Sequence, residues 1–330
     1  MSRERVQHKD LLAEQGAPVS ERRPQPGPIT VLPEAKTFFT DAVEAAGGTV
    51  VPLSHETRAI VWVANHSPEI LDRALATYPG IQWVQLPWAG VDAFAHVLKR
   101  YADAPWPLWT SAKGAYSEPV AEQALGLAIA LLREYPQRAL STSWATRQTG
   151  TSLYGKRVTI VGAGGIALEL IRLLSVFHVQ VTVVRRSSEP LGEIATTTDL
   201  DSALPDADVV VIAAASTTAT AKLFSTRQFE LMKPSAVLVN IARGAIVDQD
   251  ALVTALRDGQ IAGAGLDVTD PEPLPDGHPL WHLPTCVITS HSADTPAMTQ
   301  PLLALRVGTN VRAFLGDGRF VGVVDPGAGY

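Results

Sequence analysis

A single cysteine, Cys286, occurs in the sequence, so a disulfide framework within the chain is excluded and a reducing compartment is favoured. Basic residues are also in deficit: 27 lysines and arginines stand against 33 aspartates and glutamates, and the formal net charge is −6. Because phosphate binding needs a basic surface, no nucleic-acid partner is expected. No apolar run is long enough to span a bilayer, and the longest lies near 125–132.

The N-terminal segment lacks the apolar core that a signal peptide carries behind its charges. Residues 1–28 contain several arginines and prolines in polar company, and they are expected to form a loose tail. These absences together predict a cytoplasmic protein without a membrane partner. The spacing of histidines, acidic residues and the cysteine matches no metal-ligand pattern, so no metal site is expected.

Apolar residues make up 46% of the 330 residues, which is enough for a large core and about two domains. From residue 29 onward, short apolar runs alternate with helical patterns, as in parallel sheets with helices on both faces. The elements expected in the first domain are strands at 29–32, 50–53, 59–63 and 82–86 and helices at 35–46 and 69–77. Pro105, Pro107 and Gly114 mark its end.

A second β/α series begins at residue 157, after a long helix at 120–133. Its expected strands are 157–161, 179–184, 208–213, 236–240, 262–266 and 286–289. This order fits a doubly wound, Rossmann-type cofactor domain. The predicted organisation is a tail (1–28), a smaller substrate domain (29–112), a dinucleotide-binding domain (113–292) and a C-terminal segment (293–330) whose helix, near 295–315, returns to the substrate domain.

A glycine-rich turn follows the strand at 157–161 and opens a helix. It reads Gly162-Ala163-Gly164-Gly165-Ile166-Ala167, with the spacing G-x-G-x-x-A. Gly162 allows a tight turn, Gly164 lets the backbone approach a pyrophosphate, and Ala167 permits close packing of helix on strand. Free N–H groups at the helix N-terminus would then bind the phosphates. For such a motif by itself, a plain turn between strand and helix is the alternative.

The end of the next strand bears on the choice of dinucleotide. NAD-binding domains usually place a carboxylate there, against the ribose 2′-hydroxyl. Here the strand ends in Arg185, Arg186 and Ser187, which suit a 2′-phosphate. The prediction is therefore NADP or NAD, with NADP favoured. A solvated strand end is the alternative for the two arginines.

Three candidate catalytic side chains each follow an expected strand of the second series, where a doubly wound sheet binds its ligand. They are Arg243, Glu272 and His291. Reduction of a 2-keto acid needs a guanidinium for the carboxylate and carbonyl, a proton donor, and a carboxylate that orients the donor. These residues are predicted to fill the three roles, and Asp267 to hold the nicotinamide carboxamide. Helix capping or a surface ion pair is the alternative for Arg243, and a solvated loop for Glu272.

These segments resemble those of the D-isomer-specific 2-hydroxyacid dehydrogenase family. The most specific pieces are Val-Asn-Ile-Ala-Arg-Gly-Ala-Ile-Val-Asp (239–248) and Gly-Leu-Asp-Val-Thr-Asp-Pro-Glu-Pro-Leu-Pro (265–275), and the resemblance covers most of residues 29–318. It implies that Arg243, Glu272 and His291 are catalytic. It also implies a flavodoxin-like substrate domain, a small 2-keto or 2-hydroxy acid as substrate, and a homodimer formed largely through the cofactor domain.

The resemblance further implies contacts to substrate and cofactor. Backbone amides near Ala89 and Gly90 would hold the substrate carboxylate. Trp88 either lines the pocket or merely packs, and Tyr116 stands where many members have an asparagine that contacts substrate. The residues expected at the cofactor are Gly162, Gly164, Gly165, Ile166, Arg185, Arg186, Ser187, Thr217, Ala242 and Asp267.

The leading function is an oxidoreductase that transfers a hydride between NAD(P)H and a small 2-keto acid, with glyoxylate and hydroxypyruvate among the expected substrates. Arg185 stands where NAD-dependent members carry aspartate, and Ser290 precedes the histidine where proline is usual. The alternative is a dinucleotide-sensing binding protein on the same fold. A hydrolase on a related scaffold is disfavoured, because a suitable set of lysine and cysteine residues is lacking near the crevice.

Three further residues have interpretations that need no ligand. His178 sits where a helix often ends in glycine, so a left-handed cap is expected. Cys286 lies in an apolar strand and is expected in the core. Trp281 either lines the substrate pocket or only packs.

Overall fold

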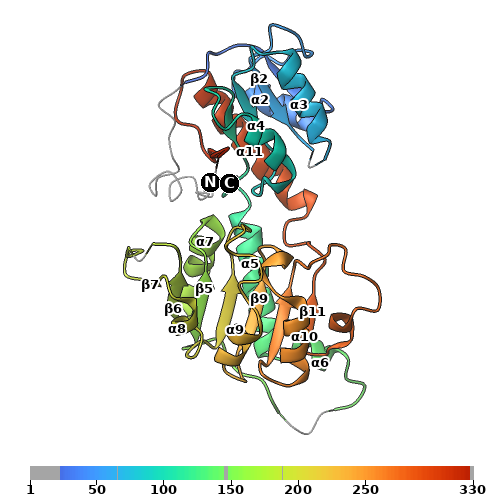
Figure 1. Ribbon diagram of the computed structural model, residues 1–330, viewed down its shortest axis with the longest axis vertical. Coiled ribbons are helices and arrows are strands. Elements are labelled where there is room, and N and C mark those ends of the chain that lie inside the picture. The colour runs from blue at the N-terminus through green and yellow to red at the C-terminus, as the bar shows by residue number, and fades with distance from the viewer. Residues whose placement is uncertain (1–22, 65, 145–147, 188, 328–330) are drawn as a thin grey trace, which may run out of the picture. The chain divides into compact units, whose positions relative to one another are not determined.

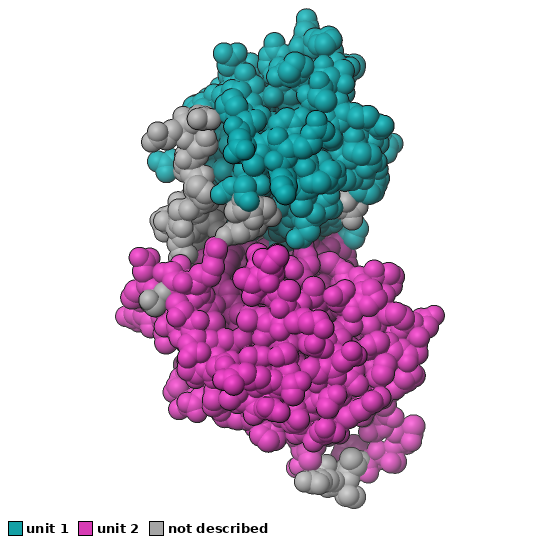
Figure 2. Space-filling model, viewed as in Figure 1, with its two compact units in different colours: residues 1–116, 296–330 teal, residues 117–295 magenta. Residues whose placement is uncertain are grey.

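The structure, a computed structural model, describes residues 23–64, 66–144, 148–187 and 189–327. The chain divides into two compact units: residues 1–116 with 296–330 form unit 1, and residues 117–295 form unit 2 (Figure 2). The boundaries predicted from the sequence lay at 112 and 292. Most of the predicted tail lies outside the described residues, and residues 23–28 form no helix or strand.

Unit 1 contains a four-stranded parallel sheet in the order β1-β2-β3-β4 within the described residues. Its strands are β1 (Ile29–Leu32), β2 (Ala59–Trp62), β3 (Trp83–Gln85) and β4 (Leu108–Thr110). A single parallel bridge places Val50 beside Ile29, on the side of β1 away from β2. With that bridge counted as a strand position, the order is the flavodoxin-like 2-1-3-4-5, which confirms the predicted class.

Two strand predictions in unit 1 were wrong. The expected strand at 50–53 is reduced to the bridge at Val50, because Pro52 has no N–H to donate to a ladder. Conversely, β4 was missed because Pro105 and Pro107 were interpreted as a domain boundary. The strand begins immediately after Pro107 and lies at the end of the strand order, where a neighbouring proline is tolerated.

The C-terminal helix belongs to unit 1. Helix α11 (Pro296–Phe314) packs against α2 (Thr37–Ala45) and β3, and Figure 1 shows it in red beside the blue elements of the N-terminal part. A buried side-chain network ties it to the sheet: the Asn310 amide donates to Gln85 (2.7 Å), and Gln85 accepts a second bond from Thr110 (2.9 Å). The other helices of the unit are α3 (Pro68–Thr77) and α4 (Ala95–Arg100).

Unit 2 contains a seven-stranded parallel sheet among the described residues, in the order β11-β10-β9-β8-β5-β6-β7. Its strands are β5 (Arg157–Val161), β6 (Gln180–Val184), β7 (Ala195–Thr197), β8 (Val209–Ile212), β9 (Val237–Asn240), β10 (Gly263–Leu266) and β11 (Cys286–Ile288). The six strands predicted for this part are present, and the short β7 was missed. Strand order reverses between β5 and β8, which is where a doubly wound sheet opens its ligand crevice.

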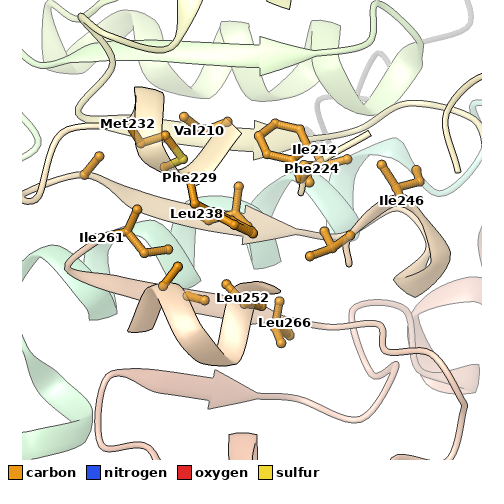
Figure 3. Close-up of a cluster of buried hydrophobic side chains, with 14 of the residues drawn as sticks. Val210, Ile212, Phe224, Phe229, Met232, Leu238, Ile246, Leu252, Ile261 and Leu266 are labelled. Atoms are coloured by element: carbon orange, nitrogen blue, oxygen red, sulfur yellow. The ribbon is translucent and has the colours of Figure 1, made fainter. Parts of the chain in front are cut away.

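Helices cover both faces of the unit 2 sheet. On one face, α5 (Ser117–Leu132) packs on β9 and β10 and also against α7 (Gly165–Leu174). On the other face, α9 (Thr226–Leu231) and α10 (Gln249–Arg257) enclose an apolar cluster. Figure 3 shows its side chains meeting between the strands and these helices, among them Val210, Ile212, Phe229, Leu238 and Leu252. The remaining helices of this unit are α6 (Tyr135–Ala139) and α8 (Leu200–Ala203).

Local conformations in unit 2 bear on two sequence interpretations. His178 has φ 52° and ends a short 3₁₀ turn, so the predicted left-handed cap is confirmed. Cys286 is partly buried and packs against the apolar cluster without belonging to it, so its predicted core position is confirmed only in part; burial raises the pKa of its thiol to about 12. None of the helices in the described segments has both the length and the apolar character to cross a membrane.

Candidate active site

The candidate site lies at the C-terminal ends of the parallel strands of unit 2. The glycine turn follows β5, the two arginines follow β6, and Thr217 follows β8. Arg243, Asp267 and His291 follow β9, β10 and β11. Because all seven strands are parallel, these segments all leave the sheet at its C-terminal end. The fold therefore brings together residues from 162 to 291, a span of 130 positions (291 − 162 + 1 = 130).

The glycine turn has the conformation that its sequence predicts. Gly162 has φ 113°, and a β-carbon there would lie 2.5 Å from the carbonyl oxygen of Ala213. Gly164 is the N-cap of α7, and a β-carbon on it would meet no atom within 4 Å. The packing of the protein therefore requires glycine at 162 but not at 164. A glycine without a packing reason at a helix N-terminus fits close approach of a pyrophosphate.

The strand beside the turn ends without a carboxylate. Arg185 is held in the sheet edge through its backbone N–H, which donates to Thr197 (2.9 Å), and it is half-buried. Arg186 is exposed, and the Ser187 hydroxyl accepts from the backbone N–H of Glu189 (3.2 Å). Arg185 and Arg186 thus stand at the strand end where an NAD-binding domain usually has an acidic residue.

The loop after β8 is closed by its own threonines. The Thr220 hydroxyl accepts from the backbone N–H of Thr217 (2.8 Å) and donates to the carbonyl of Ala215 (2.8 Å). This brace holds Thr217, the predicted cofactor contact, in a defined turn. Thr220 was not singled out from the sequence, although its hydroxyl shapes the loop.

Arg243 is presented by a turn that Asn240 organises. The Asn240 side chain, 1% exposed, accepts from the Ala242 N–H (3.0 Å) and donates to the Arg243 carbonyl (3.0 Å). One guanidinium nitrogen of Arg243 donates to the Ala242 carbonyl (2.7 Å). Asn240 was missed as a functional residue, although it stands in the quoted motif; a buried amide at the end of an apolar strand was the available signal.

Glu272 is positioned through a close backbone contact between two loops. A β-carbon on Gly244 would overlap the carbonyl carbon of Thr269, so only glycine allows the loops after β9 and β10 to touch. The Thr269 N–H in turn donates to the Glu272 carboxylate (3.1 Å). The glycine that follows Arg243 therefore also determines where the carboxylate of Glu272 lies.

His291 is held by Asp267, which is 2% exposed. The Asp267 carboxylate accepts from the Thr289 hydroxyl (2.5 Å) and from the N–H groups of Ser292 (3.0 Å) and Ala293 (3.3 Å). Its backbone carbonyl accepts the His291 N–H (2.6 Å). In unit 2, then, the carboxylate of Asp267 organises the turn that presents the imidazole. Its predicted contact with the nicotinamide carboxamide stays a prediction.

The structure brings Glu272 and His291 together. The Glu272 carboxylate lies 3.0 Å from Nδ1 of His291. A carboxylate only accepts, so Nδ1 carries the proton of this bond, and Nε2 is left for proton exchange with a substrate oxygen. Both side chains are exposed, so a reacting group can reach them.

Asp294 is a second acid near the imidazole that sequence reasoning missed. Burial raises the pKa of its carboxyl group, and the negative charge of Asp267 adds to this, against the opposing effects of His291 and Arg243. These influences place it within electrostatic range of three predicted site residues. Its position three residues after His291 was the only signal in the sequence.

The predicted substrate loop lies in unit 1. The Trp88 carbonyl accepts from the Ala112 N–H (3.1 Å), and the Tyr116 hydroxyl donates to the Pro87 carbonyl (2.7 Å). The rings of Trp88 and Tyr116 meet edge to face at 5.8 Å. Ala89 and Gly90 follow directly. Their encounter with the residues of unit 2 stays a prediction.

Comparison with known proteins identifies the family. The sequence pattern described as D-isomer specific 2-hydroxyacid dehydrogenase, NAD binding domain, matches residues 125–293, just over half of the chain. The chain belongs to this family. The resemblance inferred from the motifs is confirmed, and unit 2 of this dehydrogenase contains the NAD-binding domain.

Similar proteins agree with that assignment. An uncharacterized protein in the proB 3′ region of Corynebacterium melassecola is 38% identical over 76% of this chain and 84% of its own length. A glyoxylate reductase/hydroxypyruvate reductase of Homo sapiens is 35% identical, over 60% of this chain and 64% of its own length. A D-isomer specific 2-hydroxyacid dehydrogenase from Xanthobacter autotrophicus Py2, solved with NADPH and MES, is 25% identical with TM-score 0.77, covering 92% of this chain and all of that one.

Membership in the family makes this chain an NAD(P)-dependent oxidoreductase. Structural neighbours include complexes with NADPH and with NAD, so either dinucleotide is compatible with the fold. Among the described residues, no group of three or more histidine, cysteine or acidic side chains is arranged to hold a metal ion.

Proposed function

We propose that this dehydrogenase reduces small 2-keto acids of the glyoxylate or hydroxypyruvate type, or oxidises the corresponding D-2-hydroxy acids. The observation that carries the proposal is the Glu272–His291 hydrogen bond (3.0 Å) at the sheet edge where Arg243 and the glycine turn also lie. Relatives named as glyoxylate reductases support the substrate class. This chain covers 64% of the length of the reductase from Homo sapiens and 64% of that from Thermofilum pendens.

In this mechanism the protein positions charges and moves one proton. The guanidinium of Arg243 binds the substrate carboxylate and polarises the keto oxygen. The Nε2–H of His291 donates a proton to that oxygen while the Glu272 carboxylate stabilises the ring at Nδ1. Backbone N–H groups of Ala89 and Gly90 receive the carboxylate. A bound nicotinamide dinucleotide supplies the hydride.

Turnover with a panel of acids tests the function. Glyoxylate, hydroxypyruvate, pyruvate and phenylpyruvate, each offered with NADH and with NADPH, should show oxidation of the dinucleotide for at least one pair. Cofactor binding without turnover of any acid would instead support the dinucleotide-sensing alternative.

His291→Ala should lower kcat by about 10²–10⁴-fold, the usual contribution of general acid–base catalysis, and leave cofactor affinity nearly unchanged. Stopped-flow turnover and fluorescence titration with NADPH measure the two quantities. His282→Ala, a change of another histidine in the same unit, is the matched control. Retained turnover in the His291 variant would reject the proton-donor role.

We propose NADP as the preferred cofactor, with Arg185 and Arg186 at the 2′-phosphate and Ser187 beside them. Gly165, Ile166, Thr217 and Ala242 complete the predicted cofactor contacts. Arg185→Asp should shift the ratio of kcat/KM values toward NADH by about tenfold or more, because it replaces a phosphate-binding cation with a ribose-binding acid. An unchanged ratio would remove Arg185 from the 2′-phosphate site.

We propose a homodimer that uses an apolar groove of about 430 Å³ beside the edge strand β11. Its lining residues are Tyr135, Pro136, Ala139, Leu280, Trp281, Cys286, Val287 and Ile288. Leu140 and Trp144, which follow α6 in the chain, are 75% and 95% exposed, and exposed apolar side chains of this size favour contact with an apolar partner surface. Light scattering should give twice the chain mass, and Trp281→Asp should give a monomer.

A cytoplasmic location stays a prediction of the sequence.

A further inference from the structure

A buried cation in unit 1 has no part in the mechanism above. Arg306 of α11 is 7% exposed, and its Nη1 donates to the carbonyls of Ser111 (2.8 Å) and Lys113 (2.8 Å). A guanidinium is rarely buried without a carboxylate, because removing its charge from water is costly. The burial of this cation therefore requires an explanation.

No acid compensates this charge in the described part of the chain. Burial lowers the pKa of Arg306 to about 10, and the one group that opposes this effect among the described residues is the Tyr116 side chain, a phenol and not a carboxylate. The guanidinium is therefore charged at neutral pH, and among the described residues its charge is stabilised by two carbonyl dipoles and by no carboxylate. A charge in this state attracts an anion that arrives nearby.

The segment that Arg306 holds is bonded to the predicted substrate loop. Ala112, between the two carbonyls that Arg306 binds, donates its N–H to the Trp88 carbonyl (3.1 Å), and Ala89 and Gly90 follow Trp88. Gly322 also contacts this segment and the cation. Its carbonyl accepts the Ser111 N–H (2.7 Å), and a β-carbon on it would overlap Nη1 of Arg306. The cation is thus one hydrogen-bonded segment away from the loop.

We propose that Arg306 is a positioning residue that adds, to the direct bond from Arg243, a second positive charge for the substrate carboxylate at the loop of Ala89 and Gly90. Through its bonds to the 111–113 segment it also sets the position of that loop. The inference rests on the proposed function and deepens it, because it makes the negative charge of the acid a determinant of specificity. Neutral carbonyl compounds of the same size would be poor substrates for this reason.

The test separates charge from hydrogen bonding. Arg306→Gln keeps an NH₂ donor for the carbonyls but removes the charge, and Arg306→Lys keeps the charge. The probe is oxamate, an anionic isostere of a 2-keto acid, titrated into the full-length protein saturated with NADPH. The matched control is Arg312→Gln, which removes an exposed arginine of the same helix.

The glutamine variant should bind oxamate about tenfold more weakly and show a KM for glyoxylate raised by a similar factor, with the KM for NADPH unchanged. The lysine variant should bind oxamate within about threefold of the parent, and Arg312→Gln should match the parent. Equal losses in the glutamine and lysine variants, or a loss confined to kcat and thermal stability, would overturn the inference.

Two further outcomes are distinguishable. If the parent protein binds and turns over no 2-keto acid, the proposed function fails, whatever Arg306 does. If the parent binds oxamate and the glutamine variant binds it equally well, only the role of Arg306 fails. Should the glutamine variant not fold, the lysine variant decides: near-parental oxamate affinity supports the charge, and a tenfold loss rejects it.

Discussion

At His291 the backbone adopts a conformation that residues with a β-carbon seldom take. Ser290 and His291 have φ 48° and 52°, in the left-handed region. Each such residue costs about 1–3 kcal/mol and persists only where its surroundings enforce it. Here the Asp267 carboxylate and carbonyl provide that enforcement through four hydrogen bonds. The sequence motif predicted that His291 is a site residue. The position of its imidazole, however, depends on Asp267, an acid 24 residues earlier in the chain (291 − 267 = 24).

Asp294 gives the site a pH-dependent effect on stability. Burial raises its pKa from 3.8, so the folded state binds this proton more tightly than the unfolded state. The protonated Asp294 carboxyl therefore makes its full contribution to the stability of the folded state below about pH 3.8. This contribution is lost as the pH rises through the pKa of the group in the folded state. Asp294→Asn should therefore unfold at a higher urea concentration than the parent at pH 7, and the difference should shrink as the pH falls toward 4.

Urea titrations at pH 7, 6, 5 and 4 measure this effect, with the exposed Asp276→Asn as a control that should follow the parent throughout. A difference that stays constant with pH would show that the asparagine acts through packing alone.

Two loops of unit 2 depend on a single glycine. Gly244→Ala forces the loop after β9 away from Thr269 and should destabilise the protein by about 3 kcal/mol, the upper range for overpacking. Because the Thr269 N–H positions Glu272, kcat should fall as well.

Gly126→Ala in α5, where a β-carbon meets no atom within 4 Å, should stabilise the protein by about 0.5–1 kcal/mol.

Denaturant unfolding and steady-state kinetics check both glycine variants. Parental stability and turnover in the Gly244 variant would show that the loops have room to separate. At this scale the sequence predicted most strands and the helices α2, α3, α5, α7 and α11, because periodicity and caps are local, but it did not single out α4, α6, α8, α9 and α10. It missed β4 and β7, three residues each, because their pairing depends on neighbours distant in sequence.

Unit 1 is completed by a helix that the chain supplies last. Asn310 of α11 is fully buried and bonds Gln85 (2.7 Å) and both backbone groups of Val321 (2.8 and 2.9 Å). Asn310→Ala leaves the partly buried backbone groups of Val321 without these partners and should cost about 3 kcal/mol. Thr309→Ala, which removes an exposed hydroxyl bonded to the Leu305 carbonyl and to the Arg312 side chain, should change stability by less than about 0.5 kcal/mol.

Tryptophan fluorescence in urea should show an earlier transition for the Asn310 variant, while the NADPH affinity of unit 2 in dilute denaturant stays that of the parent. Simultaneous loss of both would show that the two units unfold together.

Local patterns in the sequence determined the class of this protein. Strand and helix periodicity, the glycine turn and the motifs around Arg243, Glu272 and His291 depend on residues near one another in the chain, and each can be recognised there. Tertiary structure alone decided that Asp267 organises the histidine turn, that Gly244 must touch Thr269, and that Arg306 is buried without an acid. Those facts depend on which distant backbone segments meet, and parallel strands bring them together only after the chain has folded.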